Sequence, residues 1–149
     1  MPVSRARFLD RMALLFEEDG LSPTSGRIFG RLLLSAEPLS LDELAADIGV
    51  SKAGASTETR VLERRGVIER VSRPGSRRVY HQVVDALPVR TMELRLERLR
   101  RFRALVREAP RGAGRRGAPV RRRLAEVDAA YGHLLGAIGA ALDGWHAGR

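Results

Sequence analysis

Apolar residues recur every three or four positions along most of this chain, as they do on the buried face of an α-helix. The ends of these segments carry recognisable signals. Ser40 and Glu43 have the spacing of a capping box, and Gly49 and Gly66 are typical of helix ends. The pattern predicts helices over residues 4–18, 23–35, 40–48, 51–65, 91–109 and 120–145.

After the fourth predicted helix the period changes from 3.6 to 2, which is the period of a β-strand. Residues 67–71 and 78–83 alternate in this way, and Pro74-Gly75 between them is typical of a turn. Together they predict a β-hairpin with a basic tip. Residues 110–119 are rich in glycine and begin and end with proline, so we expect a loop there.

Two short helices joined tightly at Gly49 and followed by a basic hairpin have the layout of a winged helix-turn-helix. In that fold the second helix enters the major groove of DNA, so its outer face needs small, polar and basic groups. Ala55, Thr59 and Leu62 would form its inner face. The alternative is an ordinary small domain with a solvated charged face, but the order of the elements favours nucleic-acid binding. The candidate DNA-binding residues are Ser51, Lys52, Ser56, Thr57, Arg60, Arg64, Arg73, Arg77 and Arg78.

The segment LSLDELAADIGVSKAGASTETRVLERRGVIERVSRPGSRRVYH, residues 39–81, resembles the winged helix-turn-helix of MarR-type bacterial transcription regulators. The preceding GLSPTSGRIFGRLLLS, residues 20–35, resembles the GbsR-like branch of that family. The resemblance implies a homodimer joined through its N- and C-terminal helices, with two winged heads on a pseudo-palindromic operator in double-stranded DNA. It also implies a recognition helix at about 51–65 and a wing at about 67–83.

We therefore expect a mainly α-helical fold with a small β-hairpin wing. Its parts would be an N-terminal dimerisation helix at 1–20, a winged helix-turn-helix at 21–85 and a C-terminal helical dimerisation region at 86–149. The last predicted helix has an apolar stripe longer than one small head can cover, and glycines that would let another helix approach closely. A dimer seam explains both features better than packing within one chain. The expected interface residues are Phe8, Met12, Leu15, Phe16, Leu124, Val127, Tyr131, Leu134, Ile138 and Leu142.

The charge balance adds an anionic partner to this prediction. The chain of 149 residues has 27 basic and 18 acidic side chains, a net charge of +9. Residues 51–81 hold 8 basic and 3 acidic side chains, which fits a DNA-binding head. A second basic zone, residues 100–123, holds ten arginines and one acid. A solvated surface is our preferred interpretation of that zone, over a second DNA contact or a site for an acidic partner.

Several classes of function are excluded or disfavoured. Without cysteine there is no disulfide, thiolate metal site or cysteine nucleophile. The three histidines lack metal-binding spacing and no catalytic motif is present, so we expect no metal, no cofactor and no enzyme. Tyr131, His133 and Trp145 could line a pocket for an unknown small-molecule effector, although core or interface packing is the commoner role. The sequence shows no secretory signal or membrane span, which favours a cytoplasmic protein.

Two other functions fit the same fold. A sequence-tolerant architectural DNA-binding protein would use both basic zones, including Arg115, Arg116 and Arg121–Arg123. A winged-helix protein-interaction module would have lost DNA binding, and the retained Lys52, Arg60 and basic hairpin argue against it. Our prediction is a DNA-binding transcription regulator. Repression is the default expectation, because a protein bound at a promoter usually excludes polymerase.

Overall fold

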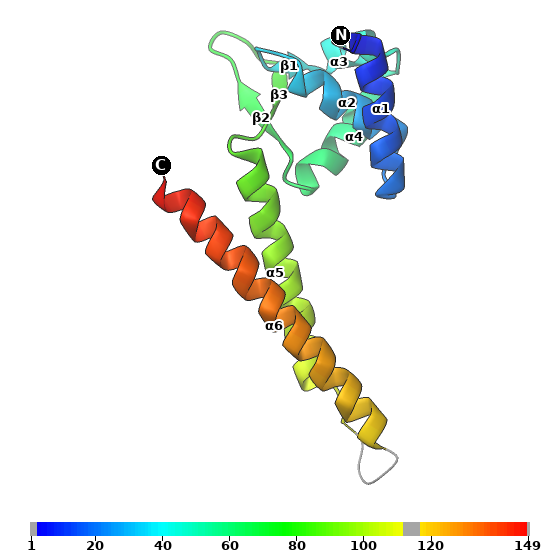
Figure 1. The fold of residues 1–149 in the computed structure, drawn as a ribbon. Helices are drawn as coiled ribbons and strands as arrows, with labels where there is room; N and C mark the ends of the chain where they lie inside the picture. The colour runs from blue at the N-terminus through cyan, green and yellow to red at the C-terminus, as the bar shows by residue number, and fades with distance from the viewer. Residues whose placement is uncertain (1–2, 112–116, 149) are drawn as a thin grey trace. The chain divides into compact units, whose positions relative to one another are not determined.

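The computed structural model describes residues 3–111 and 117–148, which belong to two compact units, Met1–Leu87 and Pro88–Arg149. The elements are α1 (Arg5–Glu18), α2 (Pro23–Leu33), β1 (Leu39–Ser40), α3 (Leu41–Ile48), α4 (Lys52–Arg64), β2 (Ile68–Ser72), β3 (Val79–Val83), α5 (Leu87–Glu108) and α6 (Ala118–Ala147) (Figure 1). This confirms the predicted fold class, mainly α-helical with a small sheet. Within the described ranges, no helix combines the length and apolar character needed to cross a membrane.

Serines start the first four helices, and glycines with positive φ lie at the ends of α1, α3 and α4. Each begins after a serine whose hydroxyl accepts a hydrogen bond from a backbone N–H of the first turn: Ser4, Ser22, Ser40 and Ser51. The predicted capping box is complete, because the Ser40 N–H also donates to Glu43 Oε2 at 2.8 Å. Gly49 ends α3 with φ +72°, and Gly66 follows α4 with φ +70°. Both predicted helix ends are confirmed.

The core of the first unit lies where α2, α3 and α4 meet the sheet. Ile28, Leu44, Ala55 and Leu62 are completely buried there, and Ile68 of β2 is nearly so. Each helix contributes the apolar face that its sequence period predicts. The core therefore fixes α4 by its inner face and leaves its outer face to solvent.

The sheet has the order β1-β3-β2, and both pairs are antiparallel. The hairpin pairs Ile68 with Val83 at one end and Ser72 with Val79 at the other. The sequence did not predict β1, because two residues are too short to show a period. Its pairing of Leu39 with His81 joins segments far apart in the chain and ties the wing to the start of α3.

Helix α1 lies directly against α2 at Gly26. A Cβ atom at this position would lie 2.5 Å from the carbonyl oxygen of Met12 and 2.7 Å from the Cα of Ala13. Farther along, the rings of Phe16 and Phe29 lie 5.4 Å apart. Helix α1 is thus packed on the winged head within one chain.

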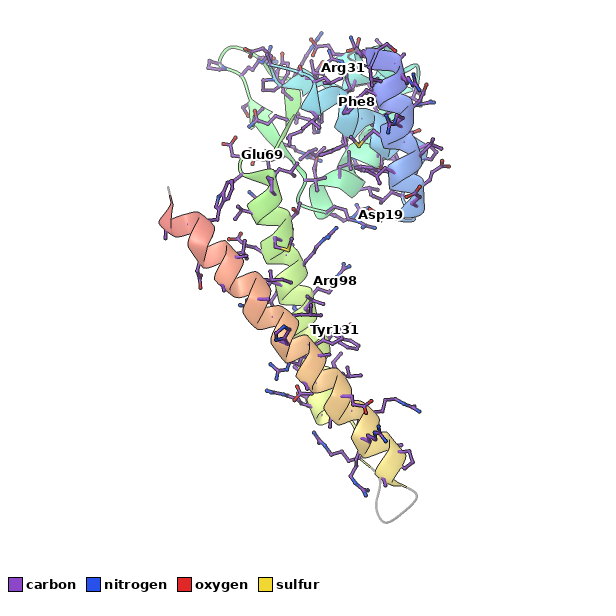
Figure 2. All side chains as sticks on the ribbon, viewed as in Figure 1. Phe8, Asp19, Arg31, Glu69, Arg98 and Tyr131 are labelled. Atoms are coloured by element: carbon purple, nitrogen blue, oxygen red, sulfur yellow. The ribbon has the colours of Figure 1, made fainter. Side chains whose placement is uncertain are left out.

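The second unit is a hairpin of α5 and α6, which run side by side in Figure 1. Asp128 of α6 accepts hydrogen bonds from Arg103 Nε at 2.6 Å and Arg107 Nε at 2.8 Å. These two arginines hold the pKa of Asp128 below its usual value. The Phe102 and Tyr131 rings lie 4.7 Å apart; Figure 2 labels Tyr131 on α6. Polar and aromatic contacts therefore link the two helices.

The boundaries of the hairpin differ from the prediction. Helix α5 begins four residues early, at Leu87, because Pro88 is tolerated in a first turn where no N–H donor is needed. The predicted loop at 110–119 is wrong at its end, because Ala118 and Pro119 already belong to α6. Residues 112–116 of that predicted loop lie outside the described ranges.

Candidate nucleic-acid interface

Helix α4 has the two faces that a groove-binding helix needs. Ala55, Thr59 and Leu62 are at most 1% exposed, which confirms the predicted inner face. On the outer face Arg60 and Arg64 are exposed, beside half-buried Ser56. The helix is therefore anchored by its apolar side and presents polar and basic groups to solvent.

The N-terminus of α4 is fixed by its cap. The Gly54 N–H donates to Ser51 Oγ at 3.0 Å, and a Cβ at position 54 would lie only 3.2 Å from the same oxygen. The Ser51 cap therefore fixes the start of α4. Thr57, also exposed, donates its hydroxyl hydrogen to the carbonyl of Ala53 at 3.1 Å and keeps lone pairs free to accept.

Two of the nine candidate DNA-binding residues already have acidic partners. Lys52 Nζ lies 2.9 Å from Asp42 Oδ1 of α3, and both side chains are exposed. Arg73 Nη2 donates to the carbonyl of Pro38 at 2.8 Å and lies 3.6 Å from Glu37 Oε2. The Arg73 guanidinium also stands 4.4 Å from the centre of the Tyr80 ring. Arg73 is therefore held against the sheet.

The other candidate arginines are unrestrained. Arg60, Arg64, Arg77 and Arg78 are exposed, and within 3–111 and 117–148 none forms an ion pair. Arg77 and Arg78 lie in the loop between β2 and β3, which is the predicted basic tip of the wing. These four guanidinium groups are free to bind an anion.

Polar contacts that hold α4 in place were not predicted from the sequence. Ser25 of α2, completely buried, donates its hydroxyl hydrogen to Glu58 Oε2 at 2.6 Å. Glu63, near the other end of α4, accepts from Arg70 Nε of β2 at 2.8 Å and lies 3.2 Å from His81 Nε2 of β3. These partners are 7 to 33 positions apart, so no local spacing signals them.

His81 lies in the second wing strand, as predicted, and is 2% exposed. Burial lowers the pKa of its imidazole, and the nearby Glu63 carboxylate opposes the shift. In the described part of the chain its Nδ1 atom is buried without a hydrogen-bond partner. His81 is therefore a neutral structural residue between the wing and α4. Within the described ranges no cluster of metal-ligating side chains occurs.

The residues predicted for a dimer interface fall into two groups. Met12 and Phe16 pack partly on the core of their own chain, whereas Leu15 is 52% exposed. A hollow on α1 is lined by Val3, Phe8, Arg11, Met12, Leu14, Leu15 and Glu18. Exposed apolar surface of this kind on a helix is typical of an interaction site.

The apolar stripe of α6 is equally uncovered. None of the described α6 residues is buried. Leu134 and Trp145 are about half exposed, at 47% and 48%, while Leu124, Val127, Tyr131, Ile138 and Leu142 are half-buried. Of the predicted effector residues, Tyr131 contacts Phe102 and His133 is exposed. The effector pocket stays a prediction.

Comparisons with known proteins agree with this geometry. The MarR family model matches residues 31–80, from the last turn of α2 into β3. The HTH-type transcriptional regulator MmpR5 of Mycobacterium tuberculosis is 38% identical over 77 residues, which are 51% of this chain but only 47% of MmpR5. The crystal structure of a transcriptional regulator is similar over 97% of this chain and 99% of its own, with a TM-score of 0.79 and 28% identity. Residues 31–80 of this chain are thus similar to the MarR family, and MmpR5 and the protein of the similar crystal structure are transcriptional regulators.

Proposed function

We propose that this protein is a DNA-binding transcription regulator that acts as a homodimer on a pseudo-palindromic operator. Helix α4 enters the major groove, and the wing of β2 and β3 contacts the backbone or the minor groove. Occupation of the operator represses transcription. The segment at residues 20–35 supports membership of the GbsR-like branch. The similarity of residues 31–80 to the MarR family and the similar regulators support this proposal.

The exposed face of α4 is the observation that carries the proposal. Arg60 and Arg64 project from a helix whose opposite face is buried, and neither has an acidic partner within the described ranges. The major groove admits an α-helix, and arginine is the residue that most often reads a base there, at guanine. A rigid helix with unneutralised arginines on its free face suits that task.

The candidate residues divide into two roles. Arg60, with Ser56 and Thr57 beside it, is our first choice for a base contact, because it lies midway along the exposed face. Removing a base-reading arginine costs about 1–3 kcal/mol and relaxes specificity at one position. The remaining six contact phosphates: Ser51, Lys52, Arg64, Arg73, Arg77 and Arg78. Arg77→Ala is expected to weaken binding to all sequences alike and to flatten the salt slope by about one.

The exposed apolar surfaces of α1 and α6 support the proposed dimer. Leu14 and Leu15 of α1 are exposed, as is Leu134 of α6. A second copy of the chain would cover such surfaces and give two recognition helices about one helical turn of DNA apart. Sedimentation at micromolar concentration is expected to give twice the chain mass, and a monomer at that concentration would refute this part of the proposal.

Selection of fragmented genomic DNA from the source organism by the purified protein, at near-physiological salt, tests the proposed function. We expect enrichment of a few intergenic sites that share an inverted repeat. Uniform recovery of all fragments, lost steeply as salt rises, would instead indicate architectural binding. No recovery of DNA would contradict DNA binding and direct attention to a protein partner.

A further inference from the structure

Two acidic residues stand among the basic residues of the proposed DNA interface. Asp42, in the first turn of α3, lies with its Oδ1 2.9 Å and its Oδ2 3.2 Å from Lys52 Nζ. Glu37, before β1, lies 3.6 Å from Arg73. Lys52 and Arg73 are thus the two members of the interface whose charge is already neutralised by a carboxylate.

The neighbourhood of these carboxylates is strongly positive. The hydrogen bond from Lys52 is the main cause of the lowered pKa of Asp42, and the charge of Arg78 adds to it. The pKa of the adjacent Glu43 is also lowered, chiefly by the Ser40 hydroxyl and further by Arg73 and Arg78. Asp42 therefore stays ionised at neutral pH and lies within the field of a second candidate phosphate contact.

We propose that Asp42 and Glu37 set the DNA affinity of this surface by competing with backbone phosphates for Lys52 and Arg73. The inference rests on the proposed function, because it concerns the same interface. Its consequence is that the protein binds duplex DNA of any sequence more weakly than its basic residues alone would allow.

The competition works in two ways that act in the same direction. An exposed ion pair holds its members only weakly, so a phosphate can displace Asp42 from Lys52. The displaced carboxylate stays close, because the Ser40 capping box fixes the first turn of α3, and it then repels the phosphate. A neutral side chain at position 42 would remove both effects.

Asp42 is the stronger of the two competitors. It directly occupies Lys52, which has no other acidic partner in the described part of the chain. Arg73 is also held by the Pro38 carbonyl and the Tyr80 ring, so it keeps its position when Glu37 is neutralised. Glu37 also lies farther from its partner, at 3.6 Å, and is mostly exposed. Neutralising Glu37 therefore changes only the local charge, and its effect on DNA affinity is smaller than that of neutralising Asp42.

The experiment compares full-length wild type with Asp42→Asn by fluorescence anisotropy, using a random-sequence duplex of about 30 base pairs. A random sequence is the right probe because phosphate contacts dominate non-specific binding. At low salt, Asp42→Asn is expected to bind about threefold to tenfold more tightly. Glu37→Gln gives about a twofold gain.

Two controls separate this mechanism from a simple change of net charge. Asp10→Asn removes the same charge and also breaks an exposed ion pair, with Arg27 at 2.9 Å, but outside the proposed interface. It is expected to change affinity by less than about twofold. In a Lys52→Ala background, Asp42→Asn can remove only the repulsion of the phosphate, so its gain is expected to be smaller than in the wild-type background. Circular dichroism melting confirms that each variant is folded.

The outcomes are distinct. Tighter binding by Asp42→Asn but not by Asp10→Asn supports the inference. Equal gains for both variants, or no gain for Asp42→Asn while wild type still binds DNA, overturns it and leaves the proposed function intact. Failure of the wild type to bind duplex at any salt concentration overturns the proposed function and the inference with it.

Discussion

The contact between α1 and α2 makes Gly26→Ala a sharp test of the packing of the head. The added Cβ would lie 2.5, 2.7 and 2.9 Å from three backbone atoms of α1, those of Met12 and Ala13. Ordinary contacts of a Cβ begin at 3.4 Å. Because backbone atoms cannot rotate away, α1 would have to withdraw from α2 by about 1 Å, which a close-packed interior resists.

The magnitude follows from two opposing terms. Alanine in a helix interior is favoured over glycine by about 0.5–1 kcal/mol. Overpacking a tight interior typically lowers the free energy of unfolding by about 1–3 kcal/mol, and occasionally by more. A clash with backbone atoms is expected near the upper end of this range, because backbone atoms cannot move aside as a side chain can. We therefore expect Gly26→Ala to lower the free energy of unfolding by roughly 2 kcal/mol, a substantial part of the stability of a domain.

Urea unfolding followed by circular dichroism measures this change, as a lower midpoint at unchanged slope. Gly30→Ala is the matched control in the same helix. Its Cβ would meet Leu9 Cδ2 at 3.0 Å and Met12 side-chain atoms at 3.4 Å, and these flexible groups can move. That variant should stay within about 1 kcal/mol of wild type. A Gly26→Ala protein as stable as wild type, or more stable, would refute the close approach of α1 to α2.

Further predictions concern stability, pH and assembly. Ser25→Ala removes the buried donor to Glu58 and should cost about 1–2 kcal/mol in urea unfolding; unchanged stability would contradict a buried bond. The lowered pKa of His81 means that the unfolded chain takes up the proton first as the pH falls below about 6.5, so stability decreases there. His81→Gln should show a smaller loss of the free energy of unfolding between pH 7.5 and 5.5 than wild type, and an equal loss would contradict a buried His81. Gly136→Ala, which meets no atom within 4 Å in one chain, should shift sedimentation towards monomer if α6 lies at a dimer seam; an unaffected dimer would place that seam elsewhere.

Much of the head could be predicted because its signals are local. A serine hydroxyl reaches the N–H three residues on, and Gly49 and Gly66 adopt positive φ values that other residues avoid. The alternation that predicted the wing, and the helical periods that predicted α3 and α4, can each be seen within one short segment of the sequence. The inner face of α4 followed directly from its period.

The rest could not be predicted because it depends on contacts between distant segments. Strand β1 exists only through its pairing with β3, and two residues carry no pattern of their own. The ion pair of Lys52 with Asp42, ten positions apart, depends on the angle at which α3 and α4 meet. The sequence predicted Arg73 as a free arginine of the wing. In the structure its guanidinium donates a hydrogen bond to the carbonyl of Pro38, 35 positions away. The sequence shows which side chains are charged, while the fold decides which charges remain free.

The most direct test of the central claim is a pair of binding titrations on a genomic site enriched by the protein, with Arg60→Ala and Arg123→Ala. Both variants lose one exposed positive charge, but only Arg60 lies on the outer face of α4. We predict that Arg60→Ala weakens binding by about 1–3 kcal/mol, roughly fivefold to 150-fold, and that Arg123→Ala stays within about twofold of wild type. Equal losses for the two variants, or no loss for Arg60→Ala, would contradict a recognition helix at α4.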